Sequence, residues 1–421
     1  MTKRFIATLL ALPLALSSAF AQDTSTSPVI KISGFGTAAT TWSDSDQAEF
    51  SRPNQASGVR KHPRSGVDSN LGLQANVEVN QWLSGTVQGL VRKDGEDDFG
   101  AELAWAFAKV KLSDQFSVRV GRMGLPVFMI SDYRNVGYAN TLLRPPAEMY
   151  SQVPFNNIDG ADATYQRSFG DTTITAQLAL GRTKAALNAG AGSLVHLQTK
   201  TITALNLVAE HGPLTMRVGH AETRASIDDS ASLNALVTGL RNAGAGYKFA
   251  QLPVLADALA LDNKKASFSS AGATLDWNNV LLQGEYAKRN TASYISDTSS
   301  WYVMAGYRFG KILPYASHAS LKSNSIVANT VPANCPAGYP AACTPTMQAL
   351  SAGVTRLTTT GTQGQQSTDT IGVRWDFYRS AALKVQIDRV KPQHGQGLFL
   401  VPAASFTGPV TVGAVSVDFV F

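Results

Sequence analysis

The sequence predicts an all-β fold, a sixteen-stranded antiparallel up-and-down barrel that crosses a membrane, and three observations support this prediction. Apolar and polar residues alternate along short segments throughout the chain, which is the period of two that a pleated strand imposes. The connections between these segments alternate between short and long. The chain also begins with a segment typical of exported proteins. In a membrane barrel the apolar face of each strand meets lipid, and the polar face lines a water-filled interior.

Residues 1–21 form a predicted secretory signal peptide. Lys3 and Arg4 precede a mostly apolar run from Phe5 to Leu16, and Ala19-Phe20-Ala21 precedes the expected cleavage point. The apolar run is too short to span a bilayer. We therefore expect residues 22–421 to form the exported barrel. Its net charge is +4, because the signal removes two basic residues from a chain of net charge +6.

Composition excludes a helical membrane protein and argues against an ordinary soluble one. No later segment contains eighteen consecutive apolar residues, the approximate length that a helix needs to cross the hydrocarbon core. Charged residues make up only 16% of the chain, which is low for a protein whose whole surface is wet. Alternating strands with lipid outside and water inside account for this intermediate composition.

Sixteen segments have the length and composition of membrane-crossing strands. They are Val29–Thr40, Ser69–Val79, Leu83–Arg92, Glu102–Leu112, Phe116–Met123, Gly160–Ser168, Thr172–Arg182, Lys200–Glu210, Leu214–Thr223, Ser267–Leu275, Val280–Arg289, Trp301–Arg308, Ile312–His318, Asp369–Phe377, Ala381–Val390 and Gly413–Phe421. Seven of the connections are short and rich in turn residues, and the eight between them are mostly long. A sixteen-stranded barrel with both ends on one side requires this count, with the eight long loops extracellular.

The alternation is clear in some strands and weak in others. In Gly413–Phe421 the valines and phenylalanines at odd positions oppose a serine and an aspartate, and Ser69–Val79 is equally regular. Glu102–Leu112 and Lys200–Glu210 carry apolar residues on both faces. Either these two strands contact another subunit, or their register is misplaced, because a shift of one residue exchanges the faces.

The long loops contain two recognisable local features. Leucines and a valine recur at helical spacing between Leu233 and Leu240, after Ser230 as a possible cap, and predict a short helix. Cys335 and Cys343 lie eight residues apart in a loop of an exported chain. Because the compartment outside the cytoplasm is oxidising, we expect a disulfide between them; the alternative is two independent thiols.

By its architecture the chain resembles the general porins of Gram-negative bacteria, and two local motifs add to the resemblance. Phe419-Val420-Phe421 looks like the terminal signal that the outer-membrane barrel assembly machinery reads. VGRMGLPVF, from Val120 to Phe128, is similar to the turn by which porins leave the fifth strand. The resemblance implies a homotrimer in the outer membrane, in contact with lipid and lipopolysaccharide. It also implies that the third loop, about 124–159, folds into the lumen and narrows it.

The resemblance and the strand pattern together indicate a charged constriction. Strand parity points Arg92, Arg119 and Arg374 inward, and we expect them to face Asp132 and Glu148 on the infolded loop. Two further arginines lie on this loop, Arg134 and Arg144. Fixed charge in a narrow path biases ion flow, so a mild anion preference follows if arginines outnumber acids there. Alternatively, the inward charges pair within the wall and only keep the lumen hydrated.

The function expected is passive diffusion of ions and small hydrophilic solutes through a water-filled pore, without a cofactor or a nucleic-acid partner. A channel specific for an organic acid, phosphate or a sugar is the main alternative, because the third loop combines arginines with tyrosines. A barrel enzyme is a remote alternative. The six histidines are scattered and none stands in a recognised catalytic arrangement. A soluble periplasmic β protein is the remaining possibility.

Overall fold

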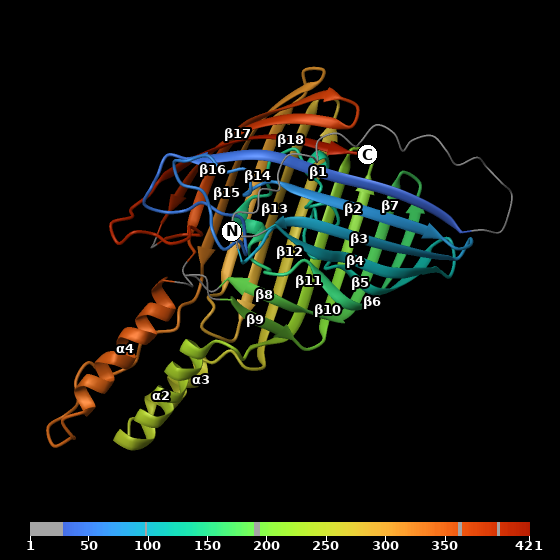
Figure 1. Ribbon diagram of the computed structural model, residues 1–421. Helices are drawn as coiled ribbons and strands as arrows, with labels where there is room; N and C mark the ends of the chain where they lie inside the picture. Colours follow the sequence, from blue (N-terminus) through green and yellow to red (C-terminus); the bar gives the residue numbers. More distant parts are fainter. Residues whose placement is uncertain (1–27, 97–98, 189–193, 361–363, 394–395) are drawn as a thin grey trace, which may run out of the picture.

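The computed structural model describes residues 28–421 apart from 97–98, 189–193, 361–363 and 394–395, so the predicted signal peptide lies outside the described residues. The chain forms a closed barrel of sixteen antiparallel strands (Figure 1). The barrel strands are β1 (Val29–Ser43), β2 (Asn70–Glu78), β3 (Leu83–Lys93), β4 (Phe99–Lys111), β5 (Phe116–Gly124), β6 (Asn157–Phe169), β7 (Thr172–Arg182), β10 (Ile202–His211), β11 (Leu214–Ile227), β12 (Lys264–Trp277), β13 (Val280–Thr291), β14 (Thr298–Tyr307), β15 (Ile312–Ser323), β16 (Gln366–Tyr378), β17 (Ala381–Pro392) and β18 (Val410–Val420). Each predicted strand overlaps one of them, and the predicted fold class is confirmed.

The two ends of the sheet meet at β1, which pairs with both β2 and β18. Beyond the last ladder pair, the Phe421 N–H donates to the Gly34 carbonyl and the Gly34 N–H donates to the Phe421 carbonyl, each at 2.9 Å. The Phe421 ring covers Gly34 closely. A Cβ added to Gly34 would lie 2.3 Å from the Cζ atom of this ring. The terminal aromatic therefore takes part in closing the barrel, so that β1 and β18 are paired with each other rather than exposed as sheet edges.

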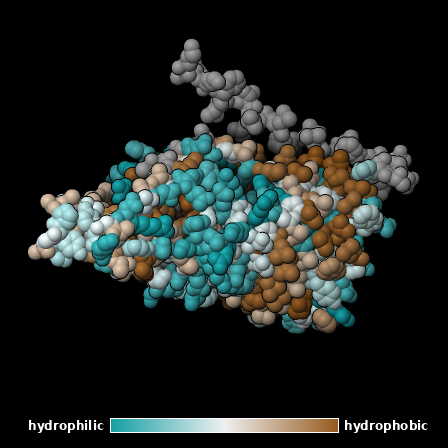
Figure 2. Space-filling view, turned by 90° about the horizontal axis from the view of Figure 1, so that it is seen from below, coloured by the Kyte–Doolittle hydropathy of each residue, from teal (hydrophilic) through white to brown (hydrophobic). Residues whose placement is uncertain are grey.

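The outer face of the barrel is apolar and its inner face is polar. Large apolar side chains are exposed on the outward positions, among them Ile32, Leu73, Val303 and Ile371, the last with 62% of its surface accessible. Buried positions include many charged and amide side chains that point inward. Figure 2 shows hydrophobic residues gathered over the part of the barrel away from the helices. This distribution is the reverse of a soluble protein and suits strands that contact lipid.

In the sequence, the strands that form β4 and β10 carry apolar residues on both faces, and the structure gives a different cause for each. In β4 the pairing with β3 shifts between Gln88 and Gly89, so that one extra residue of β4 forms a bulge. Beyond it Trp105 and Phe107 face the lumen. In β10 the inward positions include Ile202 and Ala204, which are buried in an apolar cluster against the third loop. The register of β4 therefore changes within the strand, while β10 keeps its register and meets apolar contacts inside the barrel.

The long loops contain more regular structure than the sequence indicated. The predicted helix is α2 (Ala231–Tyr247), followed by α3 (Gln251–Leu259), and a further helix, α4 (Cys343–Thr360), lies in the seventh loop. These three helices project together from the barrel (Figure 1) and share one apolar cluster. The fourth loop forms a hairpin of β8 (Lys184–Asn188) and β9 (Leu194–Thr199). None of the described helices is long and apolar enough to cross a bilayer.

The cysteines of the seventh loop form a disulfide. The sulfur atoms of Cys335 and Cys343 are 1.93 Å apart. Cys343 is fully buried and opens α4, where it belongs to the same apolar cluster as α2 and α3. The bond therefore ties the start of α4 to the loop that leads into it.

Candidate functional site

The third loop, residues 125–156, lies against the inner wall of the barrel, where an apolar cluster holds its two ends. The Phe128 ring packs against Tyr150 and against Phe268 of β12, with centroids 4.9 Å apart in both pairs. A buried carboxylate of β13 joins the same two segments. Glu285 accepts hydrogen bonds from the Met129 N–H at 3.0 Å and from the Tyr150 hydroxyl at 2.8 Å. The loop therefore has a small core of its own inside a lumen that is otherwise polar.

A buried lysine anchors the middle of the loop. Lys384 of β17 has no accessible surface, and its ammonium donates to the carbonyls of Gly137, Asn140 and Leu142 at 2.8, 2.6 and 3.2 Å. It also lies 3.0 Å from a carboxylate oxygen of Asp418, which is equally buried. The short helix η1 (Gly137–Ala139) is held at this point. One cation therefore compensates the orphan carbonyls of a tight turn and the charge of a wall carboxylate.

Ion pairs and hydrogen bonds fix the second half of the loop. Arg144 lies between two buried carboxylates, Asp68 at the end of the first loop and Asp388 of β17, with nitrogen–oxygen distances of 2.9 Å to each. Three residues later the chain enters the short helix α1 (Ala147–Tyr150). Its Glu148 accepts hydrogen bonds from Gln366, at 2.7 Å, and from Thr368 of β16. These contacts draw the loop toward β16 and β17, across the lumen from β4.

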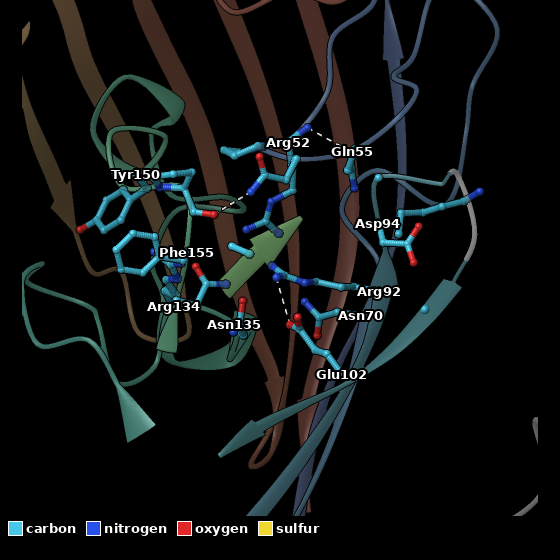
Figure 3. Close-up of a pocket in the computed structure, with 18 of the residues that line it drawn as sticks. Arg52, Gln55, Asn70, Arg92, Asp94, Glu102, Arg134, Asn135, Tyr150 and Phe155 are labelled. Atoms are coloured by element: carbon cyan, nitrogen blue, oxygen red, sulfur yellow. Dashed lines mark hydrogen bonds and ion pairs between the residues drawn. The ribbon is translucent and has the colours of Figure 1, made fainter. Parts of the chain in front are cut away.

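An open cavity of about 360 Å³ remains beside the loop, toward the long-loop end. The first loop, β3, β4, the third loop and β8 line it. Figure 3 shows Arg52, Arg92 and Arg134 directed into this space. A smaller cavity of about 20 Å³ lies between Asp132 of the loop and Trp105 of β4. We name the larger space the arginine-lined cavity, and its position makes it the candidate site for solutes.

Two of these three arginines have no carboxylate partner within the described residues. Arg92 forms an ion pair with Glu102 at 3.0 Å. The guanidinium groups of Arg52 and Arg134 make no ion pair in the described part of the chain, and Arg134 lies 5.9 Å from the centroid of the Phe128 ring. Burial, then the positive charges of Arg92 and Arg52, lower the pKa of Arg134 to about 9, so this group stays protonated at neutral pH. Unpaired positive charge in a confined space attracts anions.

The structure brings the expected constriction residues together only in part. Arg119 forms an ion pair with Asp162 of the adjacent strand at 2.5 Å rather than facing the loop acids. Arg374 forms an ion pair with Asp376 at 2.8 Å and donates to loop carbonyls, and Glu148 is hydrogen-bonded to β16. The three arginines therefore pair with Glu102, Asp162 and Asp376 rather than with Asp132 or Glu148, which matches the alternative of inward charges that pair within the wall. Each of these three arginines has a partner closer in the wall.

Sequence reasoning did not single out three of the residues that matter here. Arg52 stands in the first loop, where strand parity assigns no direction to a side chain. Asp68 lies at the end of the same loop and pairs with Arg144. Lys384 faces inward by strand parity, but nothing in the sequence indicates that it anchors the third loop. For these residues the sequence shows at most whether a strand position faces inward. It does not show which group an inward charge meets, because that depends on the path of the third loop.

Comparisons with known proteins agree with this architecture. A family model described as Gram-negative porin matches residues 7–325. OmpF of Salmonella typhi, solved in complex with daunomycin, is 14% identical, with 94% of this chain and 98% of that chain covered and a TM-score of 0.52. The outer membrane channel DcaP of Acinetobacter baumannii is 9% identical, with 95% and 99% covered and a TM-score of 0.53. The trimer form of OmpT from Vibrio cholerae is 12% identical, with 94% and 100% covered and a TM-score of 0.53. No curated protein matches the chain significantly.

Proposed function

The chain belongs to the Gram-negative porin family and is a multi-pass β-barrel of the outer membrane, and from this premise we propose that it admits ions and small hydrophilic solutes by passive diffusion, with a preference for anions. The observation that carries the proposal is the charge around the arginine-lined cavity. Seven basic side chains line it against two acidic ones, Asp94 and Glu102. Arg122 and Arg144 are paired with carboxylates behind the lining, so the excess of positive charge comes chiefly from Arg52 and Arg134. A solute that enters the pore passes this excess of positive charge in a confined space, where charge acts strongly at short range.

Replacing both unpaired arginines tests the anion preference. In Arg52→Gln/Arg134→Gln we expect the reversal potential in a salt gradient to shift toward cation preference, because two positive charges leave the cavity and no buried carboxylate loses a partner. The measurement is zero-current potential in planar bilayers with a tenfold potassium chloride gradient. The matched control Arg241→Gln/Lys391→Gln removes two cations outside the lumen and is expected to leave the potential unchanged. Equal potentials for unmodified protein and the cavity variant contradict the proposal.

The proposal includes the absence of a catalytic role. One set of side chains has the composition of a hydrolytic triad. His220 Nδ1 is hydrogen-bonded to the Ser269 hydroxyl at 2.8 Å, and His220 Nε2 lies 3.4 Å from a carboxylate oxygen of Glu222. Ser269 and His220 are cross-strand partners on the outer face of the sheet. Oxyanion stabilisation needs free donors directed at the reacting carbonyl, whereas strand N–H groups are used in the ladder. We therefore interpret the three residues as a hydrogen-bonded polar cluster at the membrane surface.

We also propose that three copies associate, with lipid and lipopolysaccharide around the assembly, and that the barrel assembly machinery reads Phe419 and Phe421. The trimer form of OmpT supports the assembly. Native mass spectrometry from mild detergent is expected to give the mass of three chains. A single-chain mass under these conditions contradicts the trimer and leaves the channel proposal untouched.

A further inference from the structure

An apolar cavity of about 130 Å³ lies next to the arginine-lined cavity. Leu187 and Leu197 of the β8–β9 hairpin line one side of it, and Ile202, Phe268 and Ile295 line the other. These residues come from four long-loop or strand-end segments that meet at the rim of the barrel. Three consecutive residues of the third loop, 153–155, border both cavities. The apolar cavity is therefore separated from the arginines by the thickness of one chain segment.

The size and lining of the apolar cavity define what it accepts. Apolar cavities of about 150 Å³ lined by aliphatic and aromatic side chains take up benzene. A cavity of about 130 Å³ suits one six-membered ring or a short branched alkyl chain. Four charged side chains border the space, and each has a partner. The two terminal nitrogens of Arg289 donate to the carbonyls of Gln152 and Ser296 at 3.2 and 2.9 Å. Lys265 forms an ion pair with Glu222 at 3.2 Å, and Lys264 donates to the Asp257 carbonyl at 2.7 Å. The cavity therefore favours an uncharged apolar group.

The neighbouring arginines define the other half of the ligand. Arg52 and Arg134 present planar donor groups that fit a carboxylate, and neither has an ion pair within the described residues. Phe155 borders both cavities, and Figure 3 shows it among the residues of the arginine-lined cavity. A molecule with a carboxylate at the arginines and a ring behind Phe155 satisfies both sites at once. Acetate or phosphate satisfies only the first.

We propose that the channel binds monocarboxylates that carry an aromatic ring or a short branched chain, in preference to small inorganic or aliphatic anions. The inference rests on the proposed function, because it gives a solute class to the same anion path. The carboxylate is held by Arg52 and Arg134, and the apolar group occupies the cavity lined by Leu187, Leu197 and Phe268. The positive charge of Arg52 and Arg134 attracts every anion to the arginine-lined cavity. Burial of a ring or branched chain in the apolar cavity then favours the anions that carry one.

Concentration-dependent block of single-channel current tests the proposal on the full chain in planar bilayers. The probes are benzoate, acetate, phosphate and benzyl alcohol. We expect the half-blocking concentration of benzoate to be about tenfold lower than that of acetate or phosphate, which corresponds to about 1.4 kcal/mol. Benzyl alcohol carries the ring without the charge and is expected to block no better than acetate. Equal block by benzoate and acetate overturns the inference, as does block by benzyl alcohol equal to that by benzoate.

Variants separate the two halves of the site. Ala266→Leu fills the apolar cavity and is expected to raise the half-blocking concentration of benzoate to that of acetate, without altering acetate block. Leu187→Gln on the hairpin is the second variant, since it lies outside the barrel wall and should leave folding unchanged; the same result is expected. Arg52→Gln/Arg134→Gln is expected to weaken block by both anions. If benzoate block survives both cavity variants, the inference fails, whereas the anion preference is judged separately by the reversal potential.

Discussion

Replacing Lys384 by methionine is expected to release the third loop from the wall and to widen the pore. The ammonium of this lysine is fully buried and binds three loop carbonyls together with Asp418. Methionine has a similar length but no donors, so the variant leaves a buried carboxylate without its cation. Removal of one member of a buried ion pair costs about 3–5 kcal/mol. We expect a larger single-channel conductance in planar bilayers and a lower temperature for the heat-induced mobility shift on gels.

Two further variants make this expectation specific. Lys391 forms an ion pair with Asp369 on the outer face, and both side chains are about half exposed. Lys391→Met is the matched control and is expected to change stability by no more than about 1 kcal/mol. Lys384→Met/Asp418→Leu removes both buried charges; it is expected to recover part of the stability but not the original conductance. Unchanged conductance in Lys384→Met contradicts the anchoring role of this residue.

The barrel was predictable because the membrane imposes one rule on every strand. Each strand separates lipid from water, so alternation, even strand number and alternating loop lengths are all visible in the sequence. The burial pattern agrees with this origin, since Ile371 is exposed outside while Asp418 has no accessible surface inside. Proline and glycine placement in loops and turns adds the boundaries. None of these signals requires knowledge of long-range contacts.

Local departures from the rule were not predictable in the same way. The bulge in β4 inverts the faces of one strand, and no residue type marks it in the sequence. The β8–β9 hairpin and α4 pack against other loops, so their formation depends on contacts between segments far apart in the chain. Inward apolar residues such as Ile202 were the one usable hint. They are unnecessary in a hydrated lumen and instead indicate that something apolar covers them.

The sequence predicts which charged side chains of the candidate site face the lumen. It does not predict which groups these side chains pair with. Parity correctly directs Arg92, Arg119 and Arg374 to the lumen, because each of these residues contacts an inward group there. Which carboxylate each one meets depends on neighbouring strands and on the path of the third loop. Arg119 lies beside Asp162 because β5 and β6 are adjacent. Arg52 and Arg134, which have no ion pair within the described residues, lie on loops, and strand periodicity carries no information about loop side chains.

The last prediction concerns Gly121, near the end of β5, where it pairs with Phe107 of β4 and Gly160 of β6. Gly121 has a φ of +133°, a region that residues with a Cβ rarely adopt. A Cβ there would lie 2.2 Å from the Ala106 carbonyl oxygen and 2.8 Å from the Phe107 Cα. Both are backbone atoms of the paired strand and have little freedom to move. Gly121→Ala is therefore expected to destabilise the barrel by about 4 kcal/mol or more.

Gly170 provides the matched control for this change. It also has a positive φ, of +58°, but it lies in a turn where a Cβ would meet nothing within 4 Å. Gly170→Ala is expected to cost about 1–2 kcal/mol, the price of left-handed backbone alone. The measurement is the urea concentration at the folding midpoint in lipid vesicles, followed by the heat-modifiable gel shift. Equal midpoints for the two variants would show that β4 moves to accommodate the added Cβ, and the destabilisation assigned to the contact with Ala106 and Phe107 would be wrong.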